Sequence, residues 1–132
     1  MSAGNEEVVR RLSDHWERGE FSADAELYHP DVEFEMRMGV EHDRATGREA
    51  MGEAWHSQLA QWSNWRTGGV EDLRSAGNRV LLETEIRGRG RHSEVEVARP
   101  AFAVFTLEGG VVTRLDLIDN REDAFAAAGI EP

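Results

Sequence analysis

The sequence has no cysteine and no lysine among its 132 residues. Without cysteine, the chain can form no disulfide, thiolate nucleophile or cysteine-based metal site. No apolar run approaches the roughly 18 residues that a membrane span requires. The opening residues show no basic segment followed by an apolar stretch, so we expect no secretory signal and predict a cytoplasmic protein.

The charge balance narrows the partners of the protein. With a formal net charge of −11, the chain lacks the basic face that displaces counterions from nucleic acid, and an anionic membrane surface would repel it. We therefore expect neither nucleic acid nor membrane as a partner. Apolar residues make up 39% and charged residues 31% of the chain, which predicts one globular domain over residues 1–132 with a single core.

Two helices are predicted near the start of the chain. The first covers residues 5–18, with Asn5 as its N-cap and Gly19 at its end. Its apolar stripe, at helical spacing, consists of Val8, Leu12, His15 and Trp16. A short second helix over 22–28 begins at a possible Ser22 cap and stops before the His29-Pro30 step, because the residue before proline disfavours helical backbone.

A strand, a loop and a third helix follow. Residues 31–37 alternate, with Val32, Phe34 and Met36 opposite Glu33, Glu35 and Arg37, as in a half-buried strand. A polar loop is expected over 39–45. Thr46 to Glu49 then has the spacing of a capping box, which predicts a helix to about Trp62. The stripe of that helix is Met51, Trp55, Leu59 and Trp62.

The rest of the chain is predicted to form antiparallel strands joined by turns. The first of them is bent or bulged by Gly68-Gly69, and the others cover 79–87, 94–107 and 111–119. Pro100 is expected at a bulge or a sheet edge, and Gly109-Gly110 in a tight hairpin. A helix over 120–128 closes the chain. Helices followed by an antiparallel meander predict an α+β fold.

The last two strands indicate where a cavity could lie. One face of the final strand carries Val111, Thr113, Leu115, Leu117 and Asp119, and the matching row on the strand before it is Ala101, Ala103, Phe105 and Leu107. The small alanines leave space, which suits a small, mostly apolar ligand; alternatively, the helix aromatics simply fill a core. The predicted lining is Leu12, Trp16, Phe34, Met36, Trp55, Leu59, Leu82, Thr84, Arg99, Ala101, Ala103, Leu115 and Leu117.

Three polar side chains are candidates for catalysis: Asp119, His15 and Tyr28. A desolvated Asp119 could act as a general base, or it could help Asn120 to cap the closing helix. His15 could transfer protons near neutral pH, or be a partly buried side chain with one hydrogen bond. Tyr28 could donate to a ligand carbonyl or hold the second helix to the core, and Arg99 could pair with Asp119, with an acidic ligand or only with solvent.

Motifs for other chemistry are missing from the sequence. There is no P-loop, Gly-x-Ser-x-Gly elbow or His-Glu-x-x-His, and the five histidines show no ligand spacing, so no metal is expected. Gly88-Arg89-Gly90 leads into a strand rather than a helix, so it is no dinucleotide fingerprint and no cofactor is expected. The arginine-rich run over 87–92 lacks interleaved aromatics and is interpreted as an exposed hairpin loop.

Short motifs along nearly the whole chain, from about Glu6 to Ile130, resemble the SnoaL-like families of the nuclear transport factor 2-like superfamily. The matching stretches are 8–12, 16–19, 27–34, 47–50, 76–80, 87–90 and 121–129. This resemblance implies a cone in which a strongly curved sheet wraps around the first and third helices and leaves a pocket at one end. It also implies a homodimer through the outer sheet face, which would carry Glu83, Glu85, Arg87, Arg114 and Ile118.

The activities known in the superfamily include polyketide cyclases, ketosteroid isomerases, dehydratases and epoxide hydrolases, so the resemblance does not decide function. The three positions that hold the basic Asp, the oxyanion-hole Asp and its Tyr in a ketosteroid isomerase align with Met36, Ala103 and Leu12 here. Many SnoaL-like proteins carry His at the Ala103 position. Tyr28 alone matches a supporting tyrosine, and the Asp-Arg-Asp set of the epoxide hydrolases cannot be placed. Isomerase chemistry of the ketosteroid kind is therefore not expected.

Three hypotheses follow from the sequence. The protein is a cofactor-free acid–base enzyme (a cyclase, isomerase, dehydratase or hydrolase) acting on a small apolar metabolite. Alternatively, it is a non-catalytic binding module with the same cavity, or a structural homodimer whose cavity is only packing. The small number of inward ionisable groups weakens the first hypothesis.

Overall fold

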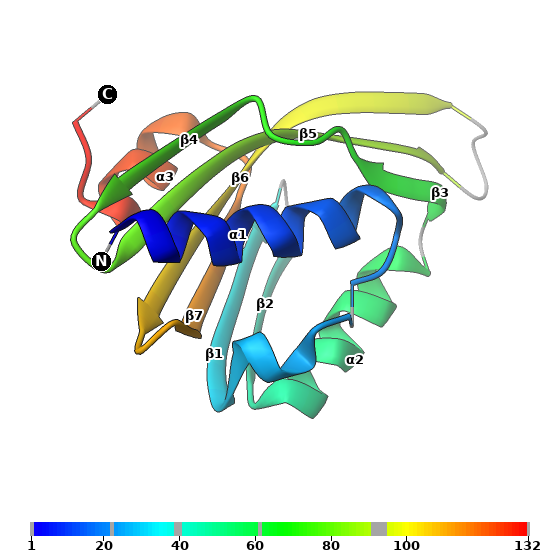
Figure 1. Ribbon diagram of the computed structural model, residues 1–132. Helices are drawn as coiled ribbons and strands as arrows, with labels where there is room; N and C mark the ends of the chain where they lie inside the picture. Colours follow the sequence, from blue (N-terminus) through cyan, green and yellow to red (C-terminus); the bar gives the residue numbers. More distant parts are fainter. Residues whose placement is uncertain (1, 22, 39–40, 61, 91–94, 132) are drawn as a thin grey trace.

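The computed structural model describes residues 2–21, 23–38, 41–60, 62–90 and 95–131. These ranges contain three α-helices, one 3-10 helix and seven strands (Figure 1). In chain order the elements are α1 (Ser2–Glu17), η1 (Ala25–Leu27), β1 (Tyr28–Met38), β2 (Glu41–Thr46), α2 (Arg48–Leu59), β3 (Trp62–Thr67), β4 (Asp72–Ala76), β5 (Arg79–Gly90), β6 (Glu96–Glu108), β7 (Val111–Ile118) and α3 (Arg121–Ala128).

The strands form one curved sheet in the order β2-β1-β7-β6-β5-β3, with β4 paired to β5 beyond the end of β3. The predicted α+β fold is confirmed. The sheet is mixed rather than wholly antiparallel, because β1 runs parallel to β7 and places Phe34 beside Leu115. The other pairings are antiparallel. The first and last strands thus meet in the middle of the sheet.

The three helices are divided between the two faces of this sheet. Helices α1 and α2 lie on the concave face and bury the larger apolar cluster, whereas α3 covers part of the convex face and buries a second one (Figure 1). The predicted packing of two helices on the concave face is therefore confirmed. None of these helices, in the part of the chain that the structure describes, is long and apolar enough to cross a membrane.

Helix α1 begins earlier than its sequence indicates. It starts at Ser2, so the proposed Asn5 cap is wrong: Asn5 is a buried residue inside the helix. The buried stripe contains Val9, Leu12 and Trp16, while Val8 is only partly buried. Gly19 ends the helix as predicted, with a positive φ of 76° and its N–H bonded to the Trp16 carbonyl at 2.9 Å.

The short helix predicted over 22–28 is wrong, and so is the loop over 39–45. Only 25–27 form a 3-10 turn, and Tyr28 already belongs to β1, although the regular alternation of buried residues starts only at Val32. Ser22, Gly39 and Val40 lie outside the described residues. Most of the predicted loop is the edge strand β2. Its polar sequence gave no sign of a strand, because an edge strand needs no buried face.

The third predicted helix is present, but both of its predicted ends are wrong. Helix α2 starts at Arg48, and the Gly47 carbonyl accepts the Met51 N–H at 3.0 Å, so Gly47 rather than Thr46 occupies the N-cap position. The helix stops at Leu59. Trp62 fits the helical spacing by coincidence and instead begins β3, where it pairs with Gly90.

The β6–β7 hairpin sets which residues face the helices. Gly109 and Gly110 have φ of 60° and 78°, as a two-residue hairpin turn requires. A bulge lies between the Thr106–Arg114 and Leu107–Val112 pairs. It reverses the alternation at the start of β7, so Val112 is buried inside in place of the predicted Val111 and Thr113.

Pro100 and Ile118 show where the edges of the outer face lie. Pro100 pairs with Glu85 in an unbroken register, so it causes no bulge; β7 pairs with β6 only from Phe102 onward, which leaves Pro100 at an edge. Ile118 is 1% exposed because α3 packs on it. Its predicted place in an exposed dimer face is therefore wrong.

Candidate functional site

A cavity of about 30 Å³ lies between the C-terminal half of α1, the middle of α2 and the concave side of the sheet. Its wall comes from seven elements that are far apart in the sequence. The lining residues are Trp16, Met36, Met38, Trp55, Thr67, Thr84, Ile86, Ala101, Phe102, Ala103 and Leu117. Of these, Met38 alone is partly exposed and the rest are buried, so Met38 marks the rim.

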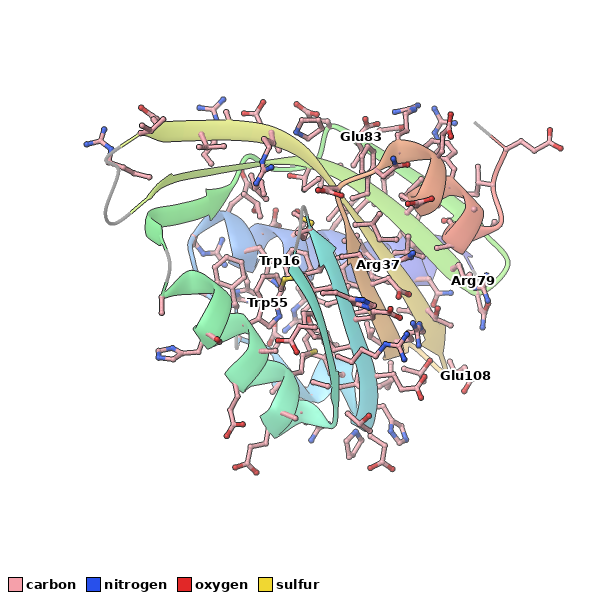
Figure 2. All side chains as sticks on the ribbon, turned by 180° about the vertical axis from the view of Figure 1, so that it is seen from behind. Trp16, Arg37, Trp55, Arg79, Glu83 and Glu108 are labelled. Carbon is pink, nitrogen blue, oxygen red and sulfur yellow. The ribbon has the colours of Figure 1, made fainter. Side chains whose placement is uncertain are left out.

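Two tryptophans form the helical wall of the cavity. Trp16 of α1 and Trp55 of α2 meet edge to face with ring centroids 5.3 Å apart, and Figure 2 shows them together between α2 and the sheet. Phe21 stacks on Trp55 at 4.7 Å, and Phe105 stacks on Trp16 at 5.6 Å. These contacts fix both indoles, so the wall they form is rigid.

Small residues on the central strands make the space. Ala101 and Ala103 of β6 face the cavity opposite Thr84 and Leu82 of β5. On the other side, Ala103 pairs with Leu117 of β7. A larger side chain at either alanine would occupy the volume that the tryptophans leave free.

The polar atoms of this wall fall into two groups. The Thr84 hydroxyl donates to the Gly69 carbonyl at 2.5 Å. In contrast, Thr67 Oγ1, Trp55 Nε1 and Trp16 Nε1 are buried without a hydrogen-bond partner among the described residues. Such atoms lose their bonds to water on folding and gain none in return, which costs stability. Among the described side chains, no ionisable group lines the cavity.

The sequence predicted a large part of this lining. The structure brings together Trp16, Met36, Trp55, Thr84, Ala101, Ala103 and Leu117 around the cavity. Other predicted residues, Leu12, Phe34, Leu82 and Leu115, are buried in the surrounding core without lining the space. Arg99 lies on the same face of β6 as Ala101, paired with Ile86, but it is exposed and does not line the cavity. The Leu59 side chain lies outside the described ones.

Four lining residues were missed: Met38, Thr67, Ile86 and Phe102. Ile86 continues the inward row of Val80, Leu82 and Thr84, so alternation could have identified it. Thr67 is the last residue of β3, a strand whose bounds were not predicted from the sequence. Phe102 belongs mainly to the convex cluster and reaches the cavity wall between two alanines, which no pattern indicates.

His15 lies away from the cavity, in an ion-pair cluster at the surface. Its Nδ1 is 2.9 Å from Glu20 Oε1 and its Nε2 is 2.6 Å from Asp24 Oδ2. These carboxylates, Glu20 first, raise the pKa of His15 above its ordinary value, while the nearby Arg18 guanidinium opposes the rise. The imidazole therefore fastens the segment after α1 and has no described contact with the cavity.

Tyr28 is fully buried at the start of β1 and does not line the cavity. Burial raises the pKa of its hydroxyl well above the ordinary value, so the group stays protonated. The Trp16 indole N–H beside it opposes the rise without forming a hydrogen bond of ordinary geometry. Tyr28 therefore contributes to the buried core beside Trp16 and not to the cavity.

Asp119 follows β7 and is partly exposed, two residues beyond the lining residue Leu117. Its own N–H donates to the Arg37 carbonyl at 3.3 Å. The cap of α3 is Asn120, whose side chain accepts the Asp123 N–H at 3.0 Å. The cap is therefore Asn120, the residue that Asp119 was expected to assist. In the described ranges, no three His, Asp or Glu side chains are grouped so that they could hold a metal ion.

Residues 9–115 match the family model described as a SnoaL-like domain. No curated protein matches the sequence. Many solved structures share the fold, at low sequence identity.

Three of these structures illustrate the range. A protein from Catenulispora acidiphila with a ketosteroid isomerase-like fold, solved in complex with trimethylamine, is 17% identical with a TM-score of 0.72, covering 95% of this chain and 94% of that one. A candidate SnoaL-like polyketide cyclase from Jannaschia sp. is 19% identical with a TM-score of 0.74, covering 98% and 94%. TerC, co-crystallised with polyporic acid, is 16% identical with a TM-score of 0.75, covering 95% and 97%.

Proposed function

The chain belongs to the SnoaL-like domain family, and from this premise we propose that it binds a small, largely apolar molecule in the cavity between Trp16 and Trp55. The single observation that carries the proposal is the combination of an alanine-lined space with buried polar atoms that lack partners. A core that served only for packing would gain stability from larger or wholly apolar side chains at these positions.

Binding without catalysis is the function that the cavity supports best. General acid–base catalysis needs a titratable side chain within hydrogen-bond reach of the reacting atom. The described lining contains none, and His15 and Tyr28 lie outside it. Trimethylamine and polyporic acid in two fold relatives support a small organic ligand in general, not a particular one.

A cofactor-free enzyme is the second candidate, and one observation favours it. Asp119 lies two positions beyond Leu117 on the same chain segment, close to the lined end of β7. A ligand longer than the cavity could reach its carboxylate. If Asp119 acts as the base, replacement by Asn abolishes turnover and leaves ligand binding and folding unchanged, whereas a binding module retains its ligand and shows no turnover to lose.

The proposal is tested by filling the cavity. In Ala103→Val, two added methyl groups occupy the free volume beside Leu117. Wild type and variant are each incubated with a metabolite mixture, and the molecules that remain bound are identified by mass spectrometry. We expect wild type to retain a ligand that the variant does not. An empty wild-type protein, or the same ligand on both, would contradict binding in this cavity.

The predicted homodimer is also a proposal, now over a smaller surface. Because α3 covers Ile118, the free part of the convex face is the part that carries Glu85, Arg87 and Arg114. Arginines and carboxylates on one face allow self-complementary pairs across a two-fold axis. Light scattering that gives a monomer mass at micromolar protein would contradict the dimer. The cytoplasmic location stays a prediction.

A further inference from the structure

The size of the cavity limits what it can hold while every side chain stays in place. Its free volume is about 30 Å³. One water molecule needs roughly 10–15 Å³ of such volume, so the space as it stands takes only about two non-hydrogen atoms. The surface that the wall presents to the cavity consists almost entirely of carbon and sulfur atoms. A polar guest would lose its bonds to water there. A guest of more than a few atoms must therefore be apolar, and it needs one side chain of the wall to move.

Most of the wall is held in place from several sides. Trp16 and Trp55 contact each other, and each is stacked on a phenylalanine. The Thr84 hydroxyl is bonded to the Gly69 carbonyl. Phe102 is also part of the apolar cluster that α3 buries on the convex face. Moving any of these side chains would break close packing or a hydrogen bond elsewhere in the core.

Two methionines of β1 line the cavity, and they differ in how they are enclosed. Met36 is 2% exposed and lies between β2 and β7 in the sheet. Met38 ends β1 and pairs with Glu41 of β2, but the pairing of β1 with β7 stops one residue earlier, at Arg37. Within the described wall, Met38 alone is partly exposed. Since its side chain is also unbranched and flexible, it is the part of the wall that can move into solvent at the least cost.

We propose that Met38 is the entrance of the cavity: its side chain covers the space in the empty protein and moves aside to admit a compact, hydrocarbon-like molecule. Residue 38 thereby controls how fast such a molecule enters. Met36, on the same face of the same strand, bounds the space from inside and takes no part in entry. A charged guest is excluded, because no ionisable side chain among the described ones lines the wall to balance its charge.

This inference rests on the proposed binding function. It adds the chemical class of the ligand and the residue that controls access to the cavity, neither of which follows from binding alone.

The test measures how fast cyclopentane exchanges between solution and the cavity, by NMR magnetisation transfer. Wild type is compared with Met38→Ala and with the matched control Met36→Ala, which removes the same atoms from the inside of the wall. We expect Met38→Ala to raise the entry rate about tenfold, because the guest no longer displaces a packed side chain. Met36→Ala enlarges the cavity without opening it, so the entry rate should stay that of wild type while release becomes slower.

A second pair of variants keeps the test valid if an alanine variant fails to fold. Met38→Ile and Met36→Ile nearly preserve the side-chain volume, which cores tolerate well. Isoleucine is branched at Cβ and stiff at χ1, so it moves aside less readily than methionine. We expect cyclopentane to enter Met38→Ile severalfold more slowly than wild type and to enter Met36→Ile at the wild-type rate.

Xenon separates this inference from the function on which it rests, because it is a single atom of the kind that apolar cavities bind. It should shift the Trp16 and Trp55 resonances of wild type without displacement of Met38. If both probes bind wild type and the entry rate of cyclopentane changes at neither position, or equally at both, the entrance role of Met38 is wrong and binding in the cavity stands. Binding of xenon without cyclopentane would also overturn that role. If neither probe binds wild type, the proposed binding function is contradicted as well.

Discussion

The concave and convex sides of the sheet differ in how closely their side chains pack. On the concave side, apolar side chains from α1, α2 and five strands surround a cavity, and tryptophan and threonine atoms in its wall lack partners. On the convex side, α3 buries a smaller and wholly apolar cluster around Phe125, whose ring is covered by Arg74 and Arg121 at 5.2 and 4.6 Å from its centroid. One chain thus contains a closely packed core and a hollow one.

This difference shows that the free volume is confined to one part of the sheet. The same sheet, and even the same strand, packs Val104 tightly on one face and leaves space beside Ala103 on the other. Free volume and unpaired donors both reduce stability. Their coincidence at one place is what a binding site requires and what a packing core avoids.

The largest effect is expected on the convex side. Replacing Phe125 by Ala removes the centre of that cluster and should lower the free energy of unfolding by about 3–5 kcal/mol. Chemical denaturation measures the change. A loss below about 1 kcal/mol, small for a buried phenylalanine, would mean that the convex core is not closely packed and would break the comparison.

Two buried alanines test the comparison directly. Adding two methyl groups in Ala124→Val, on the buried face of α3, should cost about 1–3 kcal/mol because the site is full. The same change at Ala103 fills empty space, and we expect stability within about 1 kcal/mol of wild type by the same reasoning. Thermal unfolding of both variants gives the contrast. Equal losses would show that the concave side is packed as closely as the convex side.

A smaller contrast is expected between the two cavity threonines. Thr84→Val leaves the Gly69 carbonyl without its donor, which should cost about 1–2 kcal/mol. Thr67→Val removes a hydroxyl that has no partner, and the empty protein should keep or gain stability. Denaturant titration without ligand measures both. A loss in Thr67→Val as large as in Thr84→Val would mean that the Thr67 hydroxyl is satisfied.

The smallest effect concerns the surface cluster outside the cavity. Glu20 and Asp24 raise the pKa of His15 in the folded protein, so its stabilising contribution is full below pH 6.5 and is lost as the pH rises through the raised value. Relative to His15→Gln, wild type should lose stability over that window. The exposed His56, replaced by Gln, is the control. Parallel curves for wild type and His15→Gln would show that the cluster contributes nothing.

Sequence patterns predicted which residues face the core better than they predicted where the helices and strands begin and end. Alternation placed Phe34, Ala103 and Leu117 on the inner face because burial on one side of a strand leaves a period-2 signal. It failed at the start of β7, where a bulge reversed the alternation, and at β2, where an edge strand carries no apolar row.

The candidate site was predicted in its apolar part only. The helical spacing of apolar residues correctly predicted that Trp16 and Trp55 lie on buried helix faces, and both line the cavity. It also suggested His15, which the structure places at the surface, because the edge of a stripe faces solvent once the helix ends at Gly19. The unpaired hydroxyl of Thr67 cannot be predicted from one sequence, because whether a hydroxyl is paired depends on atoms that only the fold brings together.

The central claim is that the concave cavity between Trp16 and Trp55 binds a small, largely apolar molecule. Tryptophan-labelled protein titrated with cyclopentane tests it most directly, with the four indole resonances assigned by Trp→Phe variants. We predict a saturable shift of the Trp55 indole resonance, because its ring forms part of the cavity wall, and we predict that this shift is lost in Ala103→Val. No saturable shift at Trp55, or the same shift in the filled variant, would contradict the claim.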